Sequence, residues 1–287
     1  MIPQLNFVKA NTVLSAIKLL SSDKNARLIA GGTDVIPGFQ IESKRFKDVK
    51  LLIDINSIKE LKTIKRFKDR IEIGSAVTFS ELITSNIIQS EFPLLVNAAS
   101  TVGSVQIRNL ATLAGNFINN ASCADSVPPL LVYNARIEIR SLKETRQISL
   151  EKFLLEPYRT KLKKNEIVTK VVLPLTNKNV KGDFYKLGRR RAVAISRISL
   201  AVLVELDNSI IKDIRIASGA VTPIGVRFYD LEKFAIGEKV DSDFLKKLSI
   251  ELGKTILKVT GLRWSSPYKL PVVQQMFYQL LEKVCNE

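Results

Sequence analysis

The chain is organised around residues Ser100–Ala135, which read STVGSVQIRNLATLAGNFINNASCADSVPPLLVYNA. This stretch combines a glycine-bearing segment, Thr112–Asn116, with the acid Asp125 and a Pro-Pro step that leads into an apolar run. Small residues let a backbone come close to another group, and the polar side chains here can hydrogen-bond to that group. Thr112–Asn116 therefore indicates either a ligand cradle or a tight turn, and Asp125 either a ligand contact or a helix cap.

An earlier segment, Leu28–Pro37 (LIAGGTDVIP), has the same character. A short apolar strand runs into two glycines and a Thr-Asp pair, and a helix start follows. Such glycines either direct backbone N–H groups at an anion or form only a turn. The segment matches neither G-x-G-x-x-G nor the phosphate-loop pattern ending in Gly-Lys-Ser/Thr. Two loops of this kind in one chain favour a shared ligand that carries a diphosphate.

The chain of 287 residues contains no histidine and two cysteines, Cys123 and Cys285. Catalytic triads with histidine, Cys-His pairs and histidine-bound metals are therefore excluded. Two thiols cannot hold a four-cysteine zinc or iron–sulfur site, so we expect free thiols and no metal. Cys123 reads as a small buried residue. Any chemistry must therefore come from carboxylates, lysine, tyrosine, a cysteine or a bound cofactor, and no individual side chain is predicted to be catalytic.

The net charge is +16, with 44 basic and 28 acidic residues. Nucleic-acid binding is one interpretation, and a lysine-rich surface that docks on an acidic partner is the other. The basic residues are spread along the chain, dense only at Gly188–Arg191, and aromatic residues do not interleave with them, which favours the second. No apolar run is long enough to span a membrane, and the N-terminus lacks a signal-peptide pattern. We therefore expect a soluble, cytoplasmic protein.

The apolar patterns predict an α+β protein of two domains, 1–176 and 177–287. In the first, helices are expected at Thr12–Leu20, 34–39, 79 onward and 92–100, and strands at 26–30, 51–54, 71–73, 136–140 and 166–173. The polar run Pro174–Gly182 marks the boundary. In the second, strands are expected at 184–187, 198–206 and 210–218, and helices at 231–234, 242–257 and 271–284. Runs of strands followed by runs of helices predict a sheet with helices on one face. Trp264 and Tyr268 read as core or interface residues.

Four motifs, in this order along the chain, resemble those of a known family, which the spacing of single residues does not reveal. They are LIAGGTDVIP, IGSAVTFSEL, VGSVQIRNLATLAGNFINNASCADSVPPLLVYNA and FYKLGRRRAVAISR. Together, over nearly the whole chain, they resemble the FAD-binding medium subunit of the molybdenum hydroxylases, a family that includes xanthine, carbon monoxide and nicotinate dehydrogenases. The resemblance implies a two-part FAD-binding domain of the p-cresol methylhydroxylase type. A small C-terminal domain with a three-stranded antiparallel sheet and helices would follow.

The resemblance also implies which residues contact FAD. The first loop and the second loop lie along the diphosphate in this family, and the remaining contacts lie elsewhere in the chain. Carried over, the set is Leu28, Ile29, Ala30, Gly31, Gly32, Thr33, Asp34, Val35, Thr101, Gly103, Thr112, Leu113, Ala114, Gly115, Asn116, Asp125, Val168, Tyr185 and Lys186. The second loop departs from the family pattern, because Ala114 stands where relatives have the first of two glycines. The chain also lacks the cysteine-rich insertion of some relatives.

The activity implied is that of an oxidoreductase subunit in a heterotrimer. A molybdopterin-containing large subunit would hydroxylate the substrate, and a 2Fe-2S small subunit would pass electrons to FAD in this chain, which would deliver them to NAD or another acceptor. A stand-alone flavin oxidase of the same fold is an alternative. A basic scaffold or nucleic-acid-binding protein with degenerate glycine loops is a second alternative.

Overall fold

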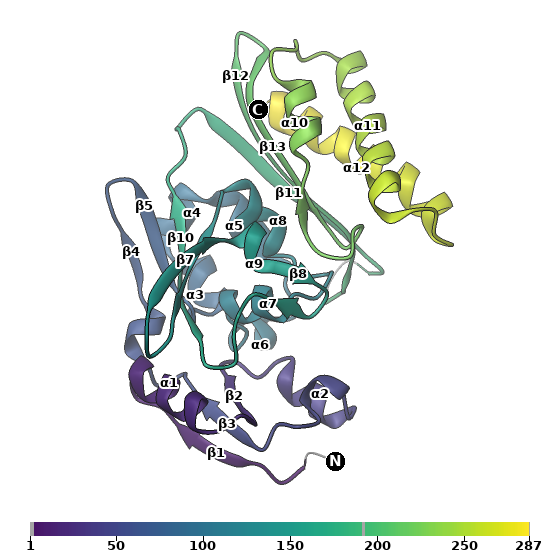
Figure 1. Cartoon of the computed structure of the whole chain (residues 1–287). Coiled ribbons are helices and arrows are strands. Elements are labelled where there is room, and N and C mark those ends of the chain that lie inside the picture. Colours follow the sequence, from purple (N-terminus) through teal and green to yellow (C-terminus); the bar gives the residue numbers. More distant parts are fainter. Residues whose placement is uncertain (1–2, 191–192, 287) are drawn as a thin grey trace. The chain divides into compact units, whose positions relative to one another are not determined.

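The structure is a computed structural model that describes residues 3–190 and 193–286. It contains two compact units, each assembled from separated chain segments (Figure 1). Unit 1 consists of the described residues up to Thr84, Ser104–Asn120 and Ala135–Pro174. Unit 2 consists of Ser85–Gly103, Ala121–Asn134 and the chain from Leu175 onward. The first 176 residues thus contribute to both units, and the boundary at residue 176 stays a prediction.

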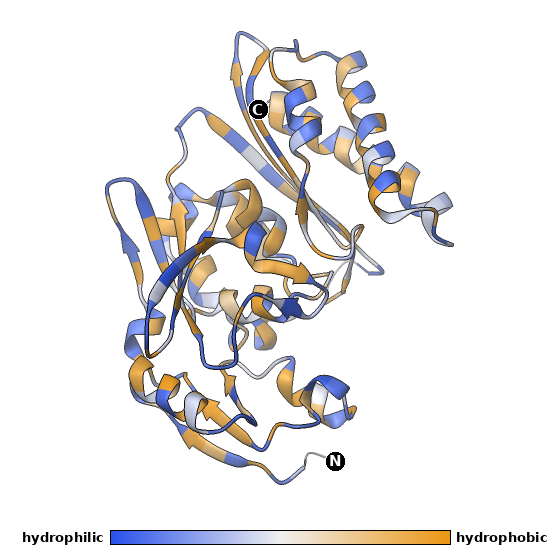
Figure 2. Cartoon of the chain, in the orientation of Figure 1, coloured by the Kyte–Doolittle hydropathy of each residue, from blue (hydrophilic) through white to orange (hydrophobic). Residues whose placement is uncertain are grey.

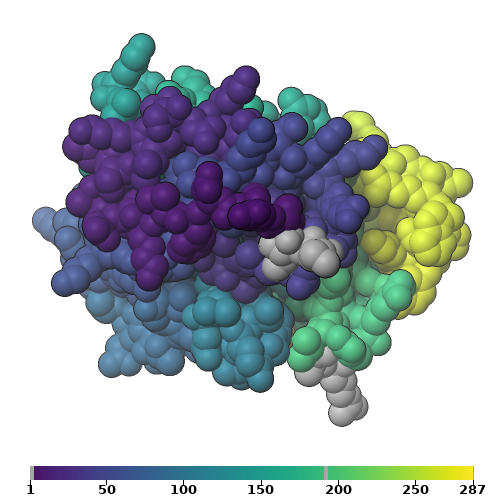
Figure 3. Space-filling model, turned by 90° about the horizontal axis from the view of Figure 1, so that it is seen from below, coloured from purple at the N-terminus to yellow at the C-terminus, as the bar shows by residue number. Residues whose placement is uncertain are grey.

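Unit 1 begins with a parallel sheet in the order β1-β3-β2. The strands are β1 (Asn6–Lys9), β2 (Ala26–Ile29) and β3 (Leu51–Asp54), and β1 is exposed throughout, on the purple surface of Figure 3. Helix α1 (Val13–Ser22) matches the predicted helix at Thr12–Leu20 and connects β2 with β1, a strand that was not predicted. It begins where the Thr12 hydroxyl accepts a hydrogen bond from the Ser15 N–H at 3.0 Å, which satisfies a free donor of the first turn. Helix α2 (Val35–Gln40) and the 3₁₀ turns η1 (Lys44–Phe46) and η2 (Lys59–Lys62) complete this layer.

A second, antiparallel sheet of unit 1 has the order β4-β5-β10-β6-β7. Its strands are β4 (Ile64–Arg66), β5 (Arg70–Gly74), β6 (Arg136–Arg140), β7 (Thr145–Ser149) and β10 (Ile167–Pro174). Helix α3 (Phe79–Thr84) starts at the predicted residue, after a capping box in which the Thr78 N–H donates to the Glu81 carboxylate at 2.8 Å. The remaining elements are α6 (Val105–Arg108), α7 (Leu113–Asn119), α9 (Leu150–Phe153) and the hairpin β8 (Leu154–Glu156)–β9 (Arg159–Thr160).

Unit 2 is built on an antiparallel sheet in the order β11-β12-β13-β14. The three predicted strands are present and longer than expected, as β11 (Val180–Gly188), β12 (Ser196–Asp207) and β13 (Ile210–Gly219). A fourth strand, β14 (Val226–Arg227), pairs with β13 through two residues and was not predicted, because two residues carry no alternation. Asn208 and Ser209 both have positive φ, which fits the two-residue turn between β12 and β13.

Helices cover both faces of this sheet, whereas the sequence predicted one covered face. Helices α10 (Tyr229–Ala235), α11 (Ser242–Thr260) and α12 (Ser266–Asn286) pack on one face through the apolar sides visible in Figure 2. Helices α5 (Pro93–Ser100) and α8 (Val127–Val132) pack on the other, and α4 (Asn86–Glu91) lies against α5. The helices on the second face were not expected there, because they come from segments that the sequence assigned to the first domain. Helix α12 also starts five residues before the predicted Pro271.

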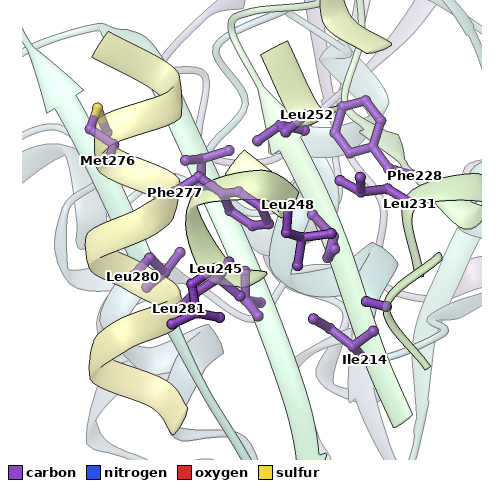
Figure 4. Packing of buried hydrophobic residues seen from close by; sticks show 14 of the residues in the cluster. Ile214, Phe228, Leu231, Leu245, Leu248, Leu252, Met276, Phe277, Leu280 and Leu281 are labelled. Atoms are coloured by element: carbon purple, nitrogen blue, oxygen red, sulfur yellow. The ribbon is translucent and has the colours of Figure 1, made fainter. Parts of the chain in front are cut away.

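The core of unit 2 lies between α10–α12 and the sheet (Figure 4). The cluster includes Leu248 and Leu252 of α11, Phe277 and Leu281 of α12, and Ile214 of β13, and all are nearly solvent-free. Burying such side chains contributes about 1.5–3 kcal/mol each, relative to exposed ones. Among the described helices, none is long and apolar enough to cross a lipid bilayer.

Candidate functional site

A cavity of about 1060 Å³ lies within unit 1, at the upper end of the range for small-molecule and cofactor sites. Its wall combines both glycine-bearing segments with parts of α2, η1, the β8–β9 hairpin and the start of β10. The predicted residues that line it are Leu28, Ala30, Gly31, Gly32, Thr33, Asp34, Val35, Thr112, Ala114, Gly115, Asn116 and Val168. Two segments some eighty residues apart in the sequence therefore line one cavity, and the shared ligand that the sequence favours stays a prediction.

Gly31 is what allows the two segments to meet. A Cβ atom at Gly31 would lie 1.9 Å from the carbonyl oxygen of Leu110, so no other residue fits there without moving the backbone. Gly32, with φ of +69°, then turns the chain into Thr33 and Asp34. The end of β2 is fixed further by Asn56, whose amide donates to the Ala30 carbonyl at 2.7 Å. The glycine pair therefore serves a turn and a backbone contact, and both place the loop against the cavity.

The second glycine-bearing segment is the first turn of a helix and not a tight turn. Thr112 is the N-cap of α7, and its hydroxyl accepts a hydrogen bond from the Gly115 N–H at 3.0 Å. Ala114, which replaces the family's glycine, is almost fully buried in this turn and still lines the cavity. Within the two glycine-bearing segments, two predicted contacts do not line the cavity: the side chains of Ile29 and Leu113 are buried in the core instead.

Ser75 gives the cavity an unsatisfied polar group. Its hydroxyl oxygen has no hydrogen-bond partner among the described residues, although the residue is only 4% exposed and lines the cavity. Its backbone is fixed, because the Ser75 N–H donates to the Thr169 carbonyl at 3.0 Å. A buried hydroxyl without a partner is unfavourable, so the arrangement fits a polar ligand that hydrogen-bonds to Ser75.

The cavity wall is strongly basic, with nine basic and three acidic side chains. The basic ones are Lys24, Arg27, Lys44, Arg45, Lys47, Lys50, Arg159, Lys163 and Lys164, and the acidic ones are Asp34, Asp48 and Glu166. Within the described chain, Arg27 makes no hydrogen bond and no ion pair within 4 Å, although the charge of Asp34 acts on it, and its guanidinium lies 4.6 Å from the centre of the Phe46 ring. Burial, and then the charge of Arg45, lowers the pKa of Arg27. An anionic ligand would relieve both effects.

Arg45 connects three of the segments that form this wall. Its guanidinium donates to Asp34 of the first loop at 3.0 Å and to the side-chain oxygen of Asn119 in α7 at 2.6 Å. It also lies 4.2 Å from the centre of the Tyr158 ring, at the tip of the β8–β9 hairpin. The hairpin is held in turn by Asn120, whose amide donates to the carbonyls of Glu156 and Arg159. Arg45 is therefore a structural cross-link, whereas Arg27 remains available to a ligand.

The predicted residues of unit 2 form a separate buried cluster. The Lys186 ammonium donates to Asp125 at 2.7 Å and to the Thr101 carbonyl at 2.8 Å, and the Ser196 hydroxyl donates to the second oxygen of Asp125. Burial raises the pKa of Asp125, while Lys186 and Ser196 oppose that rise. Gly103, with φ of +49°, follows Thr101. The cluster fixes one ammonium group inside unit 2.

Tyr185 does not join that cluster. Successive side chains of β11 point to opposite faces, so Tyr185 points away from the face that carries Lys186, and it is partly exposed. Of the dense basic run, Arg189 and Arg190 are described, while Arg191 lies outside the described residues. Both cysteines are free thiols, as expected, and Cys123 is only partly buried.

Sequence reasoning missed Arg27, Arg45, Ser75 and Tyr158. Arg27 directly precedes the predicted loop and Ser75 lies in the quoted motif IGSAVTFSEL, so both were within reach of the pattern. Arg45 follows Asp34 of the first loop by eleven residues but belongs to no motif, and Tyr158 lies far from both glycine segments in sequence, so the fold is what shows that both line the cavity.

Two family models match the chain. Residues 3–176 match "FAD binding domain in molybdopterin dehydrogenase", and residues 183–284 match "CO dehydrogenase flavoprotein C-terminal domain". The two matches together cover most of both units.

Curated relatives match along nearly their full length. The chain is 32% identical over 280 residues to the xanthine dehydrogenase FAD-binding subunit of Escherichia coli O157:H7, covering 97% of this chain and 95% of the relative. It is 30% identical to the glyceraldehyde dehydrogenase medium chain of Sulfolobus acidocaldarius, covering 98% and 99%. A solved structure of carbon monoxide dehydrogenase from Hydrogenophaga pseudoflava has the same fold, with a TM-score of 0.92 at 24% identity, covering 99% of this chain and 98% of that one.

Proposed function

Because the chain belongs to the family of FAD-binding domains in molybdopterin dehydrogenases, we propose that it is the FAD-carrying, electron-transferring medium subunit of a molybdenum hydroxylase complex. The relatives are oxidoreductase subunits, and this chain covers nearly all of their length. Its proposed partners are a molybdopterin-containing large subunit and a 2Fe-2S small subunit. Its proposed electron acceptor is NAD or another oxidant.

The cavity of unit 1 supports FAD as the ligand. A diphosphate is an anion, and the wall offers an excess of basic side chains that includes the unpaired Arg27. A dinucleotide also carries many hydroxyl and carbonyl groups, and Ser75 presents a buried hydroxyl without a partner. The cavity is lined by Leu28, 30–35, Thr112, 114–116 and Val168, and we propose that they hold the cofactor there. Ile29 and Leu113 support it from the core behind them.

The remaining proposed contacts are Thr101, Gly103, Asp125, Tyr185 and Lys186, which the family resemblance assigns to the cofactor. Here the residues of this chain have a definite task. Asp125 neutralises Lys186 and holds its ammonium in one orientation, while Ser196 and the Thr101 carbonyl restrict the pair further. A fixed ammonium offers a hydrogen-bond donor and a positive charge without further reorganisation. When bound, FAD supplies the redox chemistry, accepting electrons from a donor and delivering them to an acceptor.

The single observation that carries the proposal is the shared cavity of the two glycine-bearing segments, with its basic wall. The experiment uses the assembled complex, from which FAD is removed and then restored. We expect the stripped complex still to reduce its iron–sulfur centres when substrate is added, but to lose substrate-dependent NAD reduction until FAD returns. Unchanged NAD reduction without FAD would contradict the electron-transfer role. FAD-dependent activity with a different acceptor would instead replace NAD in the proposal.

A further inference from the structure

The turn between α11 and α12 carries the most exposed aromatic side chain in the described part of the molecule. Trp264 is 93% exposed and Leu262 is 82% exposed, although both are strongly apolar. Val259 in the last turn of α11 and Tyr268 in the first turn of α12 are also more than half exposed. We refer to Leu262–Trp264 with Val259 and Tyr268 as the turn knob. Several large apolar side chains this exposed within one short stretch are a feature of interaction sites.

The turn knob is ordered by its own hydrogen bonds. Gly261 ends α11 with φ of +66°, and its N–H donates to the Leu257 carbonyl at 2.9 Å. Arg263 and Ser266 then bond reciprocally: the Arg263 N–H donates to the Ser266 hydroxyl at 2.9 Å, and the Ser266 N–H donates to the Arg263 carbonyl at 2.9 Å. Leu262 and Trp264 are therefore presented on a fixed backbone, which lowers the entropy cost of binding.

Positive charge surrounds the turn knob. Arg263 lies within it and Lys258 precedes it, and neither has a carboxylate within 4 Å among the described residues. Arg197 and Lys269 add to this group: burial lowers the pKa of Lys269, and the charges of Arg197 and Arg263 lower it further. The Lys269 ammonium is bonded to a neutral group, the Ala220 carbonyl. The basic side chains thus crowd one another without acidic partners inside unit 2.

We propose that the turn knob docks on another protein subunit, at an apolar cleft rimmed by carboxylates. The partner is taken to be a subunit of the proposed complex, and in that respect the inference rests on the proposed function. Tryptophan and arginine are the side chains most enriched where binding energy concentrates in protein interfaces. Arginine also pairs with carboxylates through two parallel hydrogen bonds, which suits Arg263.

Two other occupants fit the surface less well. A second copy of the chain would bring the same positive charges together, which opposes self-association through this surface. Helices that bind a membrane surface carry a long apolar face. On the described α11 the exposed large apolar residues are Ile250 and Val259, which do not make a long apolar face, and its exposed side also carries ion pairs such as Lys254 with Glu251. A protein with an acidic rim satisfies both the apolar and the basic features.

The test is recovery of the partner subunits with a tagged copy of this chain, co-expressed with the large and small subunits. We expect Leu262→Ser combined with Trp264→Ser, and separately Arg263→Glu, to lower recovery of a partner about tenfold. The matched control is Ile236→Ser, a change of a half-exposed apolar residue of the same unit away from the turn. It should leave recovery unchanged. Full recovery with both knob variants, or no partner recovered by the unaltered chain, would overturn the proposal.

Two further measurements distinguish subunit docking from loss of the fold, lipid binding and self-association. The amount of FAD per chain and the melting temperature should be the same in the knob variants and the unaltered chain. Loss of FAD in all of these proteins would count against the proposed function and leave the docking result standing.

Trp264 is the only tryptophan of the chain, so its fluorescence reports on this surface alone. We expect no blue shift with anionic phosphatidylglycerol vesicles or with rising chain concentration. A shift in either titration would assign the surface to lipid or to a second copy.

Discussion

The Lys186 ammonium lies 2.7 Å from a carboxylate oxygen of Asp125, and their side chains are only 10% and 6% exposed. Removing one member of such a buried pair leaves the other charge without compensation. We therefore expect Lys186→Met or Asp125→Leu to reduce the free energy of unfolding by about 3–5 kcal/mol. The double variant should lose less than the sum of the two, because no isolated charge remains. Urea unfolding of the four proteins measures this.

An exposed pair with the same distance provides the control for this prediction. Lys254 lies 2.7 Å from Glu251, and its side chain is 65% exposed. Because water screens this pair, Lys254→Met should cost at most about 1 kcal/mol. If Lys186→Met cost no more than Lys254→Met, the buried pair would not be the constraint that we describe.

Ser75→Ala separates ligand binding from stability. The hydroxyl has no partner among the described residues, so its removal should leave the stability of the cofactor-free chain unchanged or slightly higher. If FAD hydrogen-bonds to Ser75, its Kd should rise by about 2–10-fold, the equivalent of one hydrogen bond. Fluorescence titration with FAD measures the Kd, and Ser90→Ala on the exposed surface of α4 is the control. An unchanged Kd would remove Ser75 from the site.

Arg27 and Arg45 should respond in opposite ways to the same substitution. Arg27→Met removes an unpaired guanidinium, so we expect weaker FAD binding, a smaller dependence of the Kd on salt, and no loss of stability without FAD. Arg45→Met breaks the bonds to Asp34 and Asn119, so we expect a loss of about 1–3 kcal/mol in the cofactor-free chain. Equal losses of stability in both variants would mean that Arg27 is also only structural.

The ionised carboxylate of Glu166 should add to the free energy of unfolding, and this contribution should be lost at low pH. Burial alone would raise its pKa, but hydrogen bonds from the Arg146 side chain and the Lys163 N–H outweigh that effect and lower it. A folded-state pKa below the unfolded value of about 4.3 stabilises the protein above that pH, and the contribution disappears as the pH falls through the folded pKa. Glu166→Gln should therefore be less stable than the unaltered chain at pH 7, and the difference should shrink on acidification. A difference that does not change with pH would contradict this.

Local structure was largely predictable from the sequence where side chains act on their own segment. The Thr12 cap, the Thr78–Glu81 capping box and the alternating strands of unit 2 depend on neighbours a few residues away. The glycine at Gly31 was noticed, but its reason was not, because the Leu110 carbonyl that requires it lies far along the chain. Helix α5 was predicted and helix α8 was not, and the packing of both on the unit 2 sheet depends on long-range contacts.

The same limit applies to the candidate site. The motifs identified the two glycine-bearing segments, Asp125 and Lys186, because each of them lies within one short stretch of recognisable sequence. The cation–π contact between Arg45 and Tyr158 joins residues more than a hundred positions apart, and no spacing of residues in the sequence indicates it. Trp264 was predicted to lie in the core or at an interface, and its almost complete exposure excludes the core.

The most direct test of the central claim is to purify the chain, record its absorbance spectrum, and identify the cofactor released on denaturation. A chain that emerges without cofactor is then titrated with FAD. We predict a yellow protein with about one FAD per chain, or saturable uptake of FAD that Arg27→Met weakens. A colourless chain that takes up no FAD, alone or together with its partner subunits, would contradict the assignment of the cavity to FAD.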